Sequence, residues 1–521
     1  MREISIIFLT LILCLNNGFS QDQNISNATV FEGEPYLAIN PINSNNIVLA
    51  WMGFVFQNSP RLSIKIKSSF DSGLTWNSTI TMPHIVPTYK SADPSLAFDQ
   101  NGNLFLSYID YRESPDSGGV YLFKSADGGL NWGAPTLMID AYADGDKRPI
   151  DRPFLIINEA GDKLYLTSKP APWIPAPNRP YFVSSSDFGQ TWSPFRYLDT
   201  TDYLVGPLIQ GPFAPATCSA NIFHSVYPSY LSTQNVFPQY ILASSSDNGN
   251  DFTYNSVYAG LNSAQNDSAK ISYKLIQNPV NISHLAFIFP GGNFGDFDIF
   301  YTESFNAGIN WSEPIRLNDD LQGNGKMQDM LWADFDNDGD IVVSWRDRRN
   351  AEGIGFNKAS EYYASYRDKD SINFSINFKL SDSLVNYNNI LNSSGNDFMG
   401  MEIENDTIFA AWANTRDGSL DIWFSKINAK NGLVNSLNLI SSDSKYISIF
   451  PNPSTSLFNI EMIDKSLIEE YKLINTLGEI IYSEKINKNS FNVDLNGKAK
   501  GIYFIELNNK GKTIKQKIVK N

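Results

Sequence analysis

The chain has 521 residues, more than one ordinary hydrophobic core accommodates, so two or three folded units are expected. Aromatic residues make up 13% of the sequence, and glycine and proline are frequent, which favours many short strands joined by tight turns. The formal net charge of −15 repels phosphate backbones and argues against a nucleic-acid-binding protein.

The first twenty residues have the pattern of a secretory signal peptide. Arg2 gives a positively charged start, an apolar run extends from Ile4 to Leu15, and small or polar residues lead to Ser20. The apolar run is too short for a comfortable permanent membrane anchor, and no later segment reaches transmembrane length. We therefore expect residues 1–20 to be removed and the mature chain to have no transmembrane segment.

The chain contains two cysteines, Cys14 and Cys218. Removal of the signal peptide leaves Cys218 as a single thiol, so no internal disulfide is expected. A catalytic thiol is one interpretation of Cys218, and a small buried side chain is the favoured one. Lipidation at Cys14 is a weaker alternative to signal-peptide cleavage, because a bulky leucine precedes that cysteine.

An eight-residue motif, Ser-x-Asp-x-Gly-x-x-Trp, recurs about every sixty residues, the length of a four-stranded propeller blade with its loops. The aspartate accepts hydrogen bonds from nearby backbone N–H groups and fixes a turn, and the glycine supplies a positive φ. The fourth copy ends in phenylalanine, and the fifth has Asn306 in place of aspartate. The structural aspartates of the other four copies are Asp71, Asp127, Asp187 and Asp247.

A second pattern runs in phase with the first and consists of two apolar strands joined by a polar hairpin turn. It begins near Pro35, Pro94 and Pro153, and returns later near Leu331 and Met401. Counting both patterns gives seven repeats between about residues 29 and 440, the last two without the eight-residue motif. The sequence predicts a β-propeller over residues 21–445, with seven blades favoured and six as the alternative.

The eight-residue motif is the Asp-box, and through it the chain resembles the sialidase-like (BNR repeat) β-propeller family. This resemblance implies an exo-α-sialidase type of activity on glycans or glycoproteins, with the boxes on the face away from the active site. In that family three arginines bind the sugar carboxylate, an aspartate serves as acid/base, and a Tyr–Glu pair provides the nucleophile. Glu34-Pro35-Tyr36 stands where the family has Arg-Ile-Pro, and the Tyr–Glu pair has no assigned position here.

Candidate substrate-binding residues follow the second strand of three repeats. There an aromatic residue, an aspartate or asparagine, and an arginine recur in one register, and the arginines are Arg112, Arg348 and Arg416. Forked guanidinium groups match a carboxylate bidentately, so these arginines could converge on an acidic sugar. The alternative is a structural role, such as an Asp–Arg pair that closes a loop, because residues repeated in register usually serve the repeat.

Candidate catalytic residues lie where the repeats enter their first strand, on the face expected to be functional. Glu34, Asp93, Asp151 and Arg152 occupy equivalent places there. Asp93 and Asp151 are acid/base candidates at this position, and Asp110, at the end of a second strand, is the third. Arg152 joins the candidate substrate-binding residues. A proline-rich loop over residues 169–177 contains Trp173, which could stack on a sugar ring or simply belong to a stiff packed loop.

One acidic run, with Asp336, Asp338 and Asp340, has some features of a calcium loop. It aligns with a plain hairpin turn of another repeat and has Trp345 where an EF-hand has glutamate, so a structural turn is favoured. No cofactor and no metal site are predicted, with weak calcium binding left open. Zinc-ligand spacing, a P-loop and a Ser-His-Asp signature are all missing from the sequence.

Residues 446–521 form a separate unit with alternating apolar residues and glycine turns, which predicts a small antiparallel β-sandwich. Its order of motifs is Pro-Asn-Pro at 451–453, Leu-Gly at 477–478, Gly-Ile-Tyr at 501–503 and a lysine-rich end. This order resembles the C-terminal sorting domain of the type IX secretion system. The resemblance implies that the secretion machinery is a partner and that the protein is secreted or attached to the outer cell surface.

Two classes of function are compatible with these features. The first is a secreted glycoside hydrolase of the exo-α-sialidase type, supported by the Asp-boxes and the arginines. The second is a non-catalytic glycan-binding or adhesive propeller, supported by the missing Arg-Ile-Pro start and the repeated position of those arginines. Because function belongs to sites rather than to folds, the sequence leaves catalytic activity open.

Overall fold

A computed structural model describes residues 22–55, 60–112, 117–141, 150–170, 179–199, 215–231, 236–259, 272–388, 396–430, 432, 447–462, 467–475, 480–509 and 512–521. The chain divides between residues 433 and 434 into two compact units. The expected signal peptide and Trp173 lie outside the described residues. Within the described ranges, no helix is long and apolar enough to cross a membrane.

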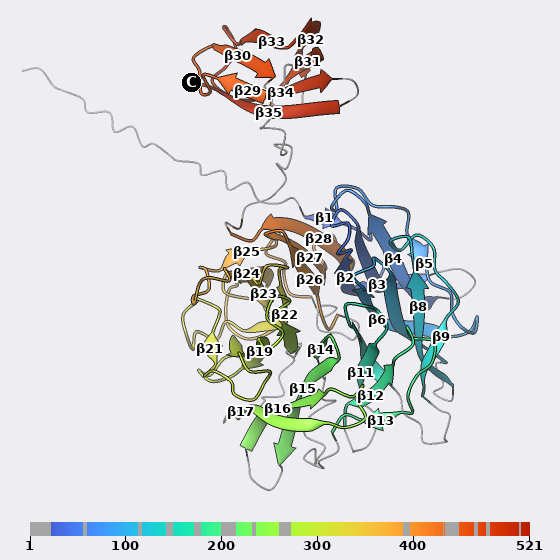
Figure 1. Cartoon of the computed structure of the whole chain (residues 1–521). Coiled ribbons are helices and arrows are strands. Elements are labelled where there is room, and N and C mark those ends of the chain that lie inside the picture. Colours follow the sequence, from blue (N-terminus) through green and yellow to red (C-terminus); the bar gives the residue numbers. More distant parts are fainter. Residues whose placement is uncertain are drawn as a thin grey trace, which may run out of the picture. The chain divides into compact units, whose positions relative to one another are not determined.

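The first unit contains seven four-stranded antiparallel sheets, the blades of a propeller (Figure 1). Blade one comprises β2 (Glu32–Ile39), β3 (Ile47–Val55), β4 (Arg61–Ser69) and β5 (Ile80–Thr81). Blade two comprises β6 (Lys90–Phe98), β7 (Leu104–Tyr111), β8 (Gly118–Ser125) and β9 (Thr136–Asp140). Blade three comprises β10 (Ile150–Ile157), β11 (Leu164–Pro170), β12 (Tyr181–Ser185) and β13 (Arg196–Tyr197).

The remaining four blades continue in chain order. Blade four comprises β14 (Ala216–Ser219), β15 (Ile222–Leu231), β16 (Val236–Ser245) and β17 (Thr253–Ala259). Blade five comprises β18 (Lys274–Gln277), β19 (Leu285–Gly291), β20 (Asp298–Ser304) and β21 (Ile315–Arg316). Blade six comprises β22 (Gln328–Phe335), β23 (Ile341–Asp347), β24 (Glu361–Arg367) and β25 (Phe378–Lys379). Blade seven comprises β26 (Gly400–Glu404), β27 (Thr407–Asn414), β28 (Asp421–Asn428) and β1 (Gln23–Asn24).

The ring closes in blade seven with strands from both ends of the unit. The short β1 pairs antiparallel with β28, so the N-terminal segment supplies the outer strand of a blade whose other three strands come from the far end of the propeller. The inner strands β2, β6, β10, β14, β18, β22 and β26 each pack against the next, and β26 packs against β2. Seven blades are therefore confirmed, and the six-bladed alternative is not supported.

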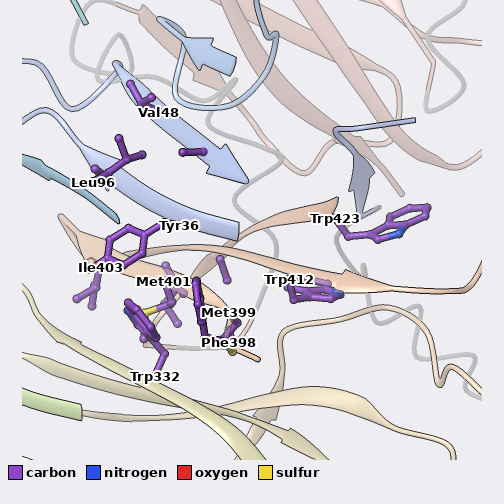
Figure 2. Packing of buried hydrophobic residues seen from close by; sticks show 14 of the residues in the cluster. Tyr36, Val48, Leu96, Trp332, Phe398, Met399, Met401, Ile403, Trp412 and Trp423 are labelled. Atoms are coloured by element: carbon purple, nitrogen blue, oxygen red, sulfur yellow. The ribbon is translucent and has the colours of Figure 1, made fainter. Parts of the chain in front are cut away.

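Large aromatic side chains fill the spaces between blades. Four of them close the second strand of their repeat and are at most 1% exposed: Trp51, Tyr108, Trp345 and Trp412. A second group gathers near the axis, where Tyr36, Trp332 and Phe398 come from three different segments (Figure 2). The Tyr36 and Trp332 rings meet edge to face with centroids 5.3 Å apart. Truncating a buried aromatic to alanine costs about 3–5 kcal/mol, so this packing contributes strongly to the stability of the propeller.

The Asp-box turns follow the third strand of their blades and share one hydrogen-bond pattern. In the first box the Ser69 hydroxyl donates to Asp71 (2.8 Å), and the backbone N–H groups of Gly73 and Thr75 donate to Ser69 and Asp71, each at 2.8 Å. The boxes of Asp127, Asp187, Asp247 and Asn306 repeat this pattern. Because first and third strands of an antiparallel blade run the same way, the boxes lie where first strands end. We call this end of the propeller the box face and the opposite end, where first strands begin, the entry face.

The second unit is a small sandwich of two antiparallel sheets. One sheet contains β29 (Ile447–Phe450), β30 (Leu457–Met462) and β33 (Ser490–Asp494). The other contains β31 (Ile468–Ile474), β32 (Ile480–Lys488), β34 (Gly501–Asn509) and β35 (Lys512–Lys520). Its own hydrophobic core includes Phe458, Leu473, Ile505 and Ile518, all at most 3% exposed, so this unit buries apolar surface independently of the propeller.

Candidate functional site

A distorted backbone shapes the entry face at the start of three neighbouring inner strands. Glu34 in β2, Asp93 in β6 and Arg152 in β10 have φ values of 54°, 53° and 48°, and each precedes a proline. The antiparallel register of each strand shifts at this point, as in a β-bulge. Bulges redirect side chains, and positive φ at non-glycine residues is costly and tends to occur at functional sites. These three positions therefore define the candidate site.

Two carboxyl groups meet within this site, and both are buried. Glu34 is 2% exposed and Asp93 is 8% exposed. Burial raises the pKa of Glu34 well above its usual range, and the neighbouring Asp93 raises it further. Burial also raises the pKa of Asp93 to about 6, with Asp151 as the second cause. The interaction between the two groups raises the pKa of Glu34 and lowers that of Asp93, so Asp93 is the carboxyl group that ionises first.

Two further carboxylates and two cations complete the cluster. Arg152 donates its backbone N–H to Asp93 (2.9 Å) and pairs with Asp397 through its guanidinium group (2.6 Å). The Lys169 ammonium lies 2.6 Å from Asp151. The Asp151 and Asp397 side chains are 23% and 21% exposed, which makes them the members most open to solvent. Among the described residues, four carboxyl groups thus share two cations at this site.

The sequence signals for this cluster were uneven. The repeat register placed Glu34, Asp93, Asp151 and Arg152 together, and the structure brings them together. Asp397 and Lys169 were missed. Asp397 was missed because it lies just before β26, in a repeat that lacks the acidic residue followed by proline. Lys169 was missed because it lies on β11 at the start of the proline-rich stretch, which was interpreted as a loop.

Arg348 does not join this cluster. Its side chain is buried, and its guanidinium donors are directed at the Phe356 and Met327 carbonyls and at both oxygens of Asp329. Arg346 also forms a bidentate pair with Asp329, at 2.7 and 2.5 Å. A substrate carboxylate could reach Arg348 only by displacing these partners. This geometry favours the structural alternative for Arg348.

Arg416 holds the N-terminal segment of the propeller. Its guanidinium group lies 2.7 Å from Asp22 and 2.6 Å from Asp382, and it stacks 4.1 Å from the centre of the Trp423 ring. Asp22 comes immediately before β1, so Arg416 ties the closing strand to blade seven. Arg112 follows β7 as an exposed residue, and its backbone N–H donates to the Ser117 carbonyl (3.1 Å). The three repeated arginines thus have different surroundings.

Asp110 has partners of its own. Its carboxylate accepts hydrogen bonds from the Ile85 backbone N–H (2.6 Å) and the Ser91 hydroxyl (2.9 Å), and it lies 2.9 Å from Nδ1 of His84. Asp110 is fully buried at the end of β7. Of the three acid/base candidates, Asp93 and Asp151 therefore belong to the entry-face cluster, and Asp110 belongs to a histidine-centred group.

A hydrogen-bonded Tyr–Glu pair does occur in the propeller, in β20. The Tyr301 hydroxyl donates to Glu303 (2.6 Å), which also pairs with Arg367 (2.8 Å) and His284 (2.9 Å). Burial alone would raise the pKa of Glu303, but the hydrogen bonds from His284, Arg367 and Tyr301 lower it to about 2. Glu303 precedes the box turn of Asn306, so this pair lies toward the box face, at the other end of the strands from Glu34.

The acidic run of blade six is a hairpin turn. Asp336 accepts hydrogen bonds from the backbone N–H groups of Asn405 and Asp406, and Asp338 pairs with Lys369 at 2.7 Å. Asp340 accepts hydrogen bonds from the Tyr366 hydroxyl and the Lys369 backbone. Among the described residues, no group of three metal-ligating side chains could hold a metal ion.

A cavity of about 360 Å³ lies on the axis toward the box face, lined by the later parts of inner strands. The Lys274 ammonium is 3.7 Å from the centre of the Trp332 ring, and Asp334 and Glu402 also line the wall. Burial lowers the pKa of Lys274 to about 8 and raises that of Asp334 to about 7. The cavity offers room for a small polar ligand, whereas the entry-face cluster offers acid–base chemistry.

Several solved structures are similar to this chain at low sequence identity. A mutant of the NanB sialidase from Streptococcus pneumoniae is 13% identical, with 80% of this chain and 71% of that chain covered and a TM-score of 0.40. An alpha-L-arabinofuranosidase of Fusarium graminearum, with arabinobiose, is 13% identical over 80% of this chain and 99% of that chain, with a TM-score of 0.45. A Penicillium chrysogenum alpha-L-arabinanase is 13% identical over 79% and 100%, with a TM-score of 0.43. No curated protein matches the chain.

The C-terminal unit has a family match of its own. Residues 448–521 match the family model described as the secretion system C-terminal sorting domain. This match confirms the predicted sorting domain and the predicted destination. The chain is a type IX secretion substrate that is released or attached at the outer cell surface, and its C-terminal unit belongs to the secretion system C-terminal sorting domain family.

Proposed function

We propose that the propeller is a glycoside hydrolase whose acid–base chemistry takes place at the entry-face cluster. The observation that carries this proposal is the buried Glu34–Asp93 carboxyl pair, held on a distorted backbone beside the more exposed Asp151. Glycoside hydrolysis generally needs two carboxyl groups, one protonated and one ionised. Neighbouring carboxyl groups whose environments drive their pKa values apart meet that need.

The roles follow from exposure and protonation. Asp93 has a pKa near 6 and can donate or accept a proton around neutral pH, which suits a general acid/base. Asp151, at 23% exposure, is the carboxylate best placed to contact a sugar. Glu34 lies deeper and retains its proton, so it acts on Asp93 as a positioning residue. Arg152 and Lys169 hold the surrounding carboxylates in place.

The charge of the cluster favours a neutral glycan. An acidic sugar would bring another carboxylate to a site where carboxyl groups outnumber cations among the residues that the structure describes, and the resulting repulsion opposes binding. The pairing of Arg348 and Arg416 with internal carboxylates also weakens the case for an arginine triad that binds sialic acid. The exo-α-sialidase type of activity stays a prediction. The experiment below must distinguish it from hydrolysis of a neutral glycoside.

The test uses the purified full-length chain and a panel of chromogenic glycosides that includes neutral pentosides, neutral hexosides and a sialoside. We expect turnover of a neutral glycoside, and we expect Asp93→Asn and Asp151→Asn to lower kcat/KM by about 10²–10⁴-fold. Asp338→Asn, in the exposed hairpin, is the matched control and should retain full activity.

Two other outcomes would overturn the proposal. Turnover of the sialoside alone would favour the sialidase-type activity, and the site would need a different set of residues. Retained binding on a glycan array, with no turnover of any glycoside, would identify a non-catalytic glycan-binding propeller.

A further inference from the structure

A serine, a histidine and an aspartate from three different segments line up at the junction of blades one and two. The hydroxyl oxygen of Ser63, in β4, lies 3.0 Å from Nε2 of His84. Nδ1 of the same ring lies 2.9 Å from Oδ1 of Asp110 at the end of β7. His84 follows β5 in a segment held by a 2.7 Å hydrogen bond from the Tyr108 hydroxyl to the Pro83 carbonyl.

The hydrogen bonds around Asp110 assign the tautomer of the ring. Asp110 is fully buried and accepts hydrogen bonds from the Ile85 backbone N–H and the Ser91 hydroxyl, so the carboxylate is fixed in place. The Ser91 hydroxyl also lies 3.0 Å from Nδ1, but it donates its hydrogen to Asp110. A carboxylate only accepts hydrogen bonds, so the hydrogen between His84 and Asp110 lies on Nδ1. The lone pair of Nε2 then faces the Ser63 hydroxyl. This is the arrangement that a serine nucleophile, its general base and an orienting acid require.

We propose that Ser63, His84 and Asp110 form a second catalytic site, one that hydrolyses short-chain carboxylic esters. It shares no residue with the entry-face cluster and does not rest on the proposed glycosidase activity. Ser63 is 2% exposed and the His84 side chain is 14% exposed, so the nucleophile is accessible only to small groups. The acyl group is therefore a small one, such as acetyl.

The reaction balances with water as the only co-reactant. Ser63 Oγ attacks the ester carbonyl carbon while its proton moves to His84 Nε2. The carbon–oxygen bond to the alcohol breaks, His84 returns the proton to the leaving oxygen, and an acyl-Ser63 ester remains. Water then adds to this ester in the same way, releasing the carboxylic acid and restoring the Ser63 hydroxyl. Asp110 acts throughout as a positioning residue for the imidazole.

The experiment combines covalent labelling with ester turnover on the purified full-length chain. A fluorophosphonate probe should label Ser63, as located by peptide mass spectrometry, and p-nitrophenyl acetate should be hydrolysed faster than a long-chain p-nitrophenyl ester. Ser63→Ala and His84→Ala should lower acetate hydrolysis by about 10²–10⁴-fold. Asp110→Asn leaves the Ser63 hydroxyl in place but should slow its labelling, because His84 is no longer positioned as a base. If Asp110 only supported the fold, a folded Asp110→Asn protein would be labelled at the wild-type rate.

Ser68→Ala is the matched control. Ser68 lies on the same strand with the same 2% exposure, and its hydroxyl has no hydrogen-bond partner among the described residues. It should leave labelling and turnover unchanged. The proposal fails if the probe does not modify Ser63 in the folded wild-type chain, or if Ser63→Ala retains ester turnover. Because labelling is measured on the wild type, a variant that does not fold cannot obscure the result. Loss of glycosidase activity in Asp93→Asn with ester turnover intact would separate the two sites.

Discussion

Two inner strands of the propeller, β6 and β22, each begin with a distorted backbone segment that contains an aspartate. The charged groups around the two aspartates are opposite in sign. In blade two, Asp93 faces the carboxyl groups of Glu34 and Asp151, and its pKa rises to about 6. In blade six, Asp329 precedes Met330, which has a φ of 51°, and faces the guanidinium groups of Arg346 and Arg348. Burial would raise the pKa of Asp329, but the two arginines hold it well below its usual range.

Asp329 lies one residue before the positive-φ position that Asp93 itself occupies, and different partners give the two aspartates different roles. Asp329 is ionised and pairs with two arginines, so it stabilises the packing of the strands. Its low pKa makes it unsuited to proton transfer near neutral pH. Asp93 is surrounded by other carboxyl groups and can exchange a proton near neutral pH. A repeat protein can thus use one backbone distortion for stability in one blade and for a candidate active site in another.

Breaking the blade-six network should have the largest effect on stability. Asp329→Asn leaves two buried arginines without their charge partner, and such a loss costs about 3–5 kcal/mol. Urea unfolding of the full-length chain should show a correspondingly lower unfolding free energy. Asp338→Asn removes an exposed pair with Lys369 and should cost less than about 1 kcal/mol. Equal losses in the two variants would contradict the structural role given to Asp329.

The pH dependence of the unfolding free energy should have opposite signs for the contributions of Asp93 and Asp329. The pKa of Asp93 is raised by burial, so between its unfolded value of about 3.9 and its folded value of about 6 the folded state holds more protons than the unfolded state. Stability therefore falls as pH rises through this window, and Asp93→Asn should remove on the order of 3 kcal/mol of that fall.

Asp329 should behave in the opposite way. Its pKa is lowered, so its contribution is present above the unfolded pKa and is lost as pH falls toward the folded value. Urea unfolding between about pH 2 and pH 8 gives both slopes, because the Asp329 contribution is lost below its unfolded pKa and the Asp93 contribution changes between about pH 4 and pH 6. The wild type is the reference. A wild-type curve unchanged in slope by Asp93→Asn would show that Asp93 titrates normally.

The smallest effect is expected at the box face, where an aspartate lies at the surface. Hydrogen bonds from the Thr191 hydroxyl and backbone lower the pKa of Asp187 to about 2. Asn306 fills the same position in the fifth box and accepts the equivalent backbone hydrogen bond at 2.9 Å. Asp187→Asn should therefore change the unfolding free energy by less than about 0.5 kcal/mol, and Asp187→Ala should cost about 1 kcal/mol. A large cost for asparagine would show that the charge itself holds the turn.

Local signals in the sequence predicted most of the fold. Each Asp-box is a turn whose hydrogen bonds lie within a few residues, so its spacing reports the blade length directly, and the seven-bladed propeller and the sorting domain are both confirmed. The closing strand β1 was not predicted, because a two-residue strand at Gln23–Asn24 has no periodicity of its own. Its place depends on pairing with β28, about four hundred residues away in the chain.

Site residues were harder because their partners come from other strands and blades. Arg416 shares the register of Arg112, four residues after an aromatic residue, whereas Arg348 lies one residue before that register. Only the folded chain shows that Arg348 pairs with Asp329 and that Arg416 pairs with Asp22. Ser63, His84 and Asp110 carry no common spacing, since β4, the segment after β5 and β7 bring them together only on packing. The catalytic and substrate-binding assignments therefore stay predictions.

The most direct test of the account measures turnover and stability on the same two preparations, Asp93→Asn and Asp329→Asn, in the full-length chain. The substrate is the neutral glycoside that the wild type hydrolyses fastest. We expect Asp93→Asn to lose about 10²–10⁴-fold in kcat/KM while its stability at neutral pH is retained or increased. We expect Asp329→Asn to lose several kcal/mol of stability while its folded fraction turns over substrate at a rate close to that of the wild type. Wild-type turnover in Asp93→Asn would contradict the central claim that the entry-face carboxyl pair is the active site.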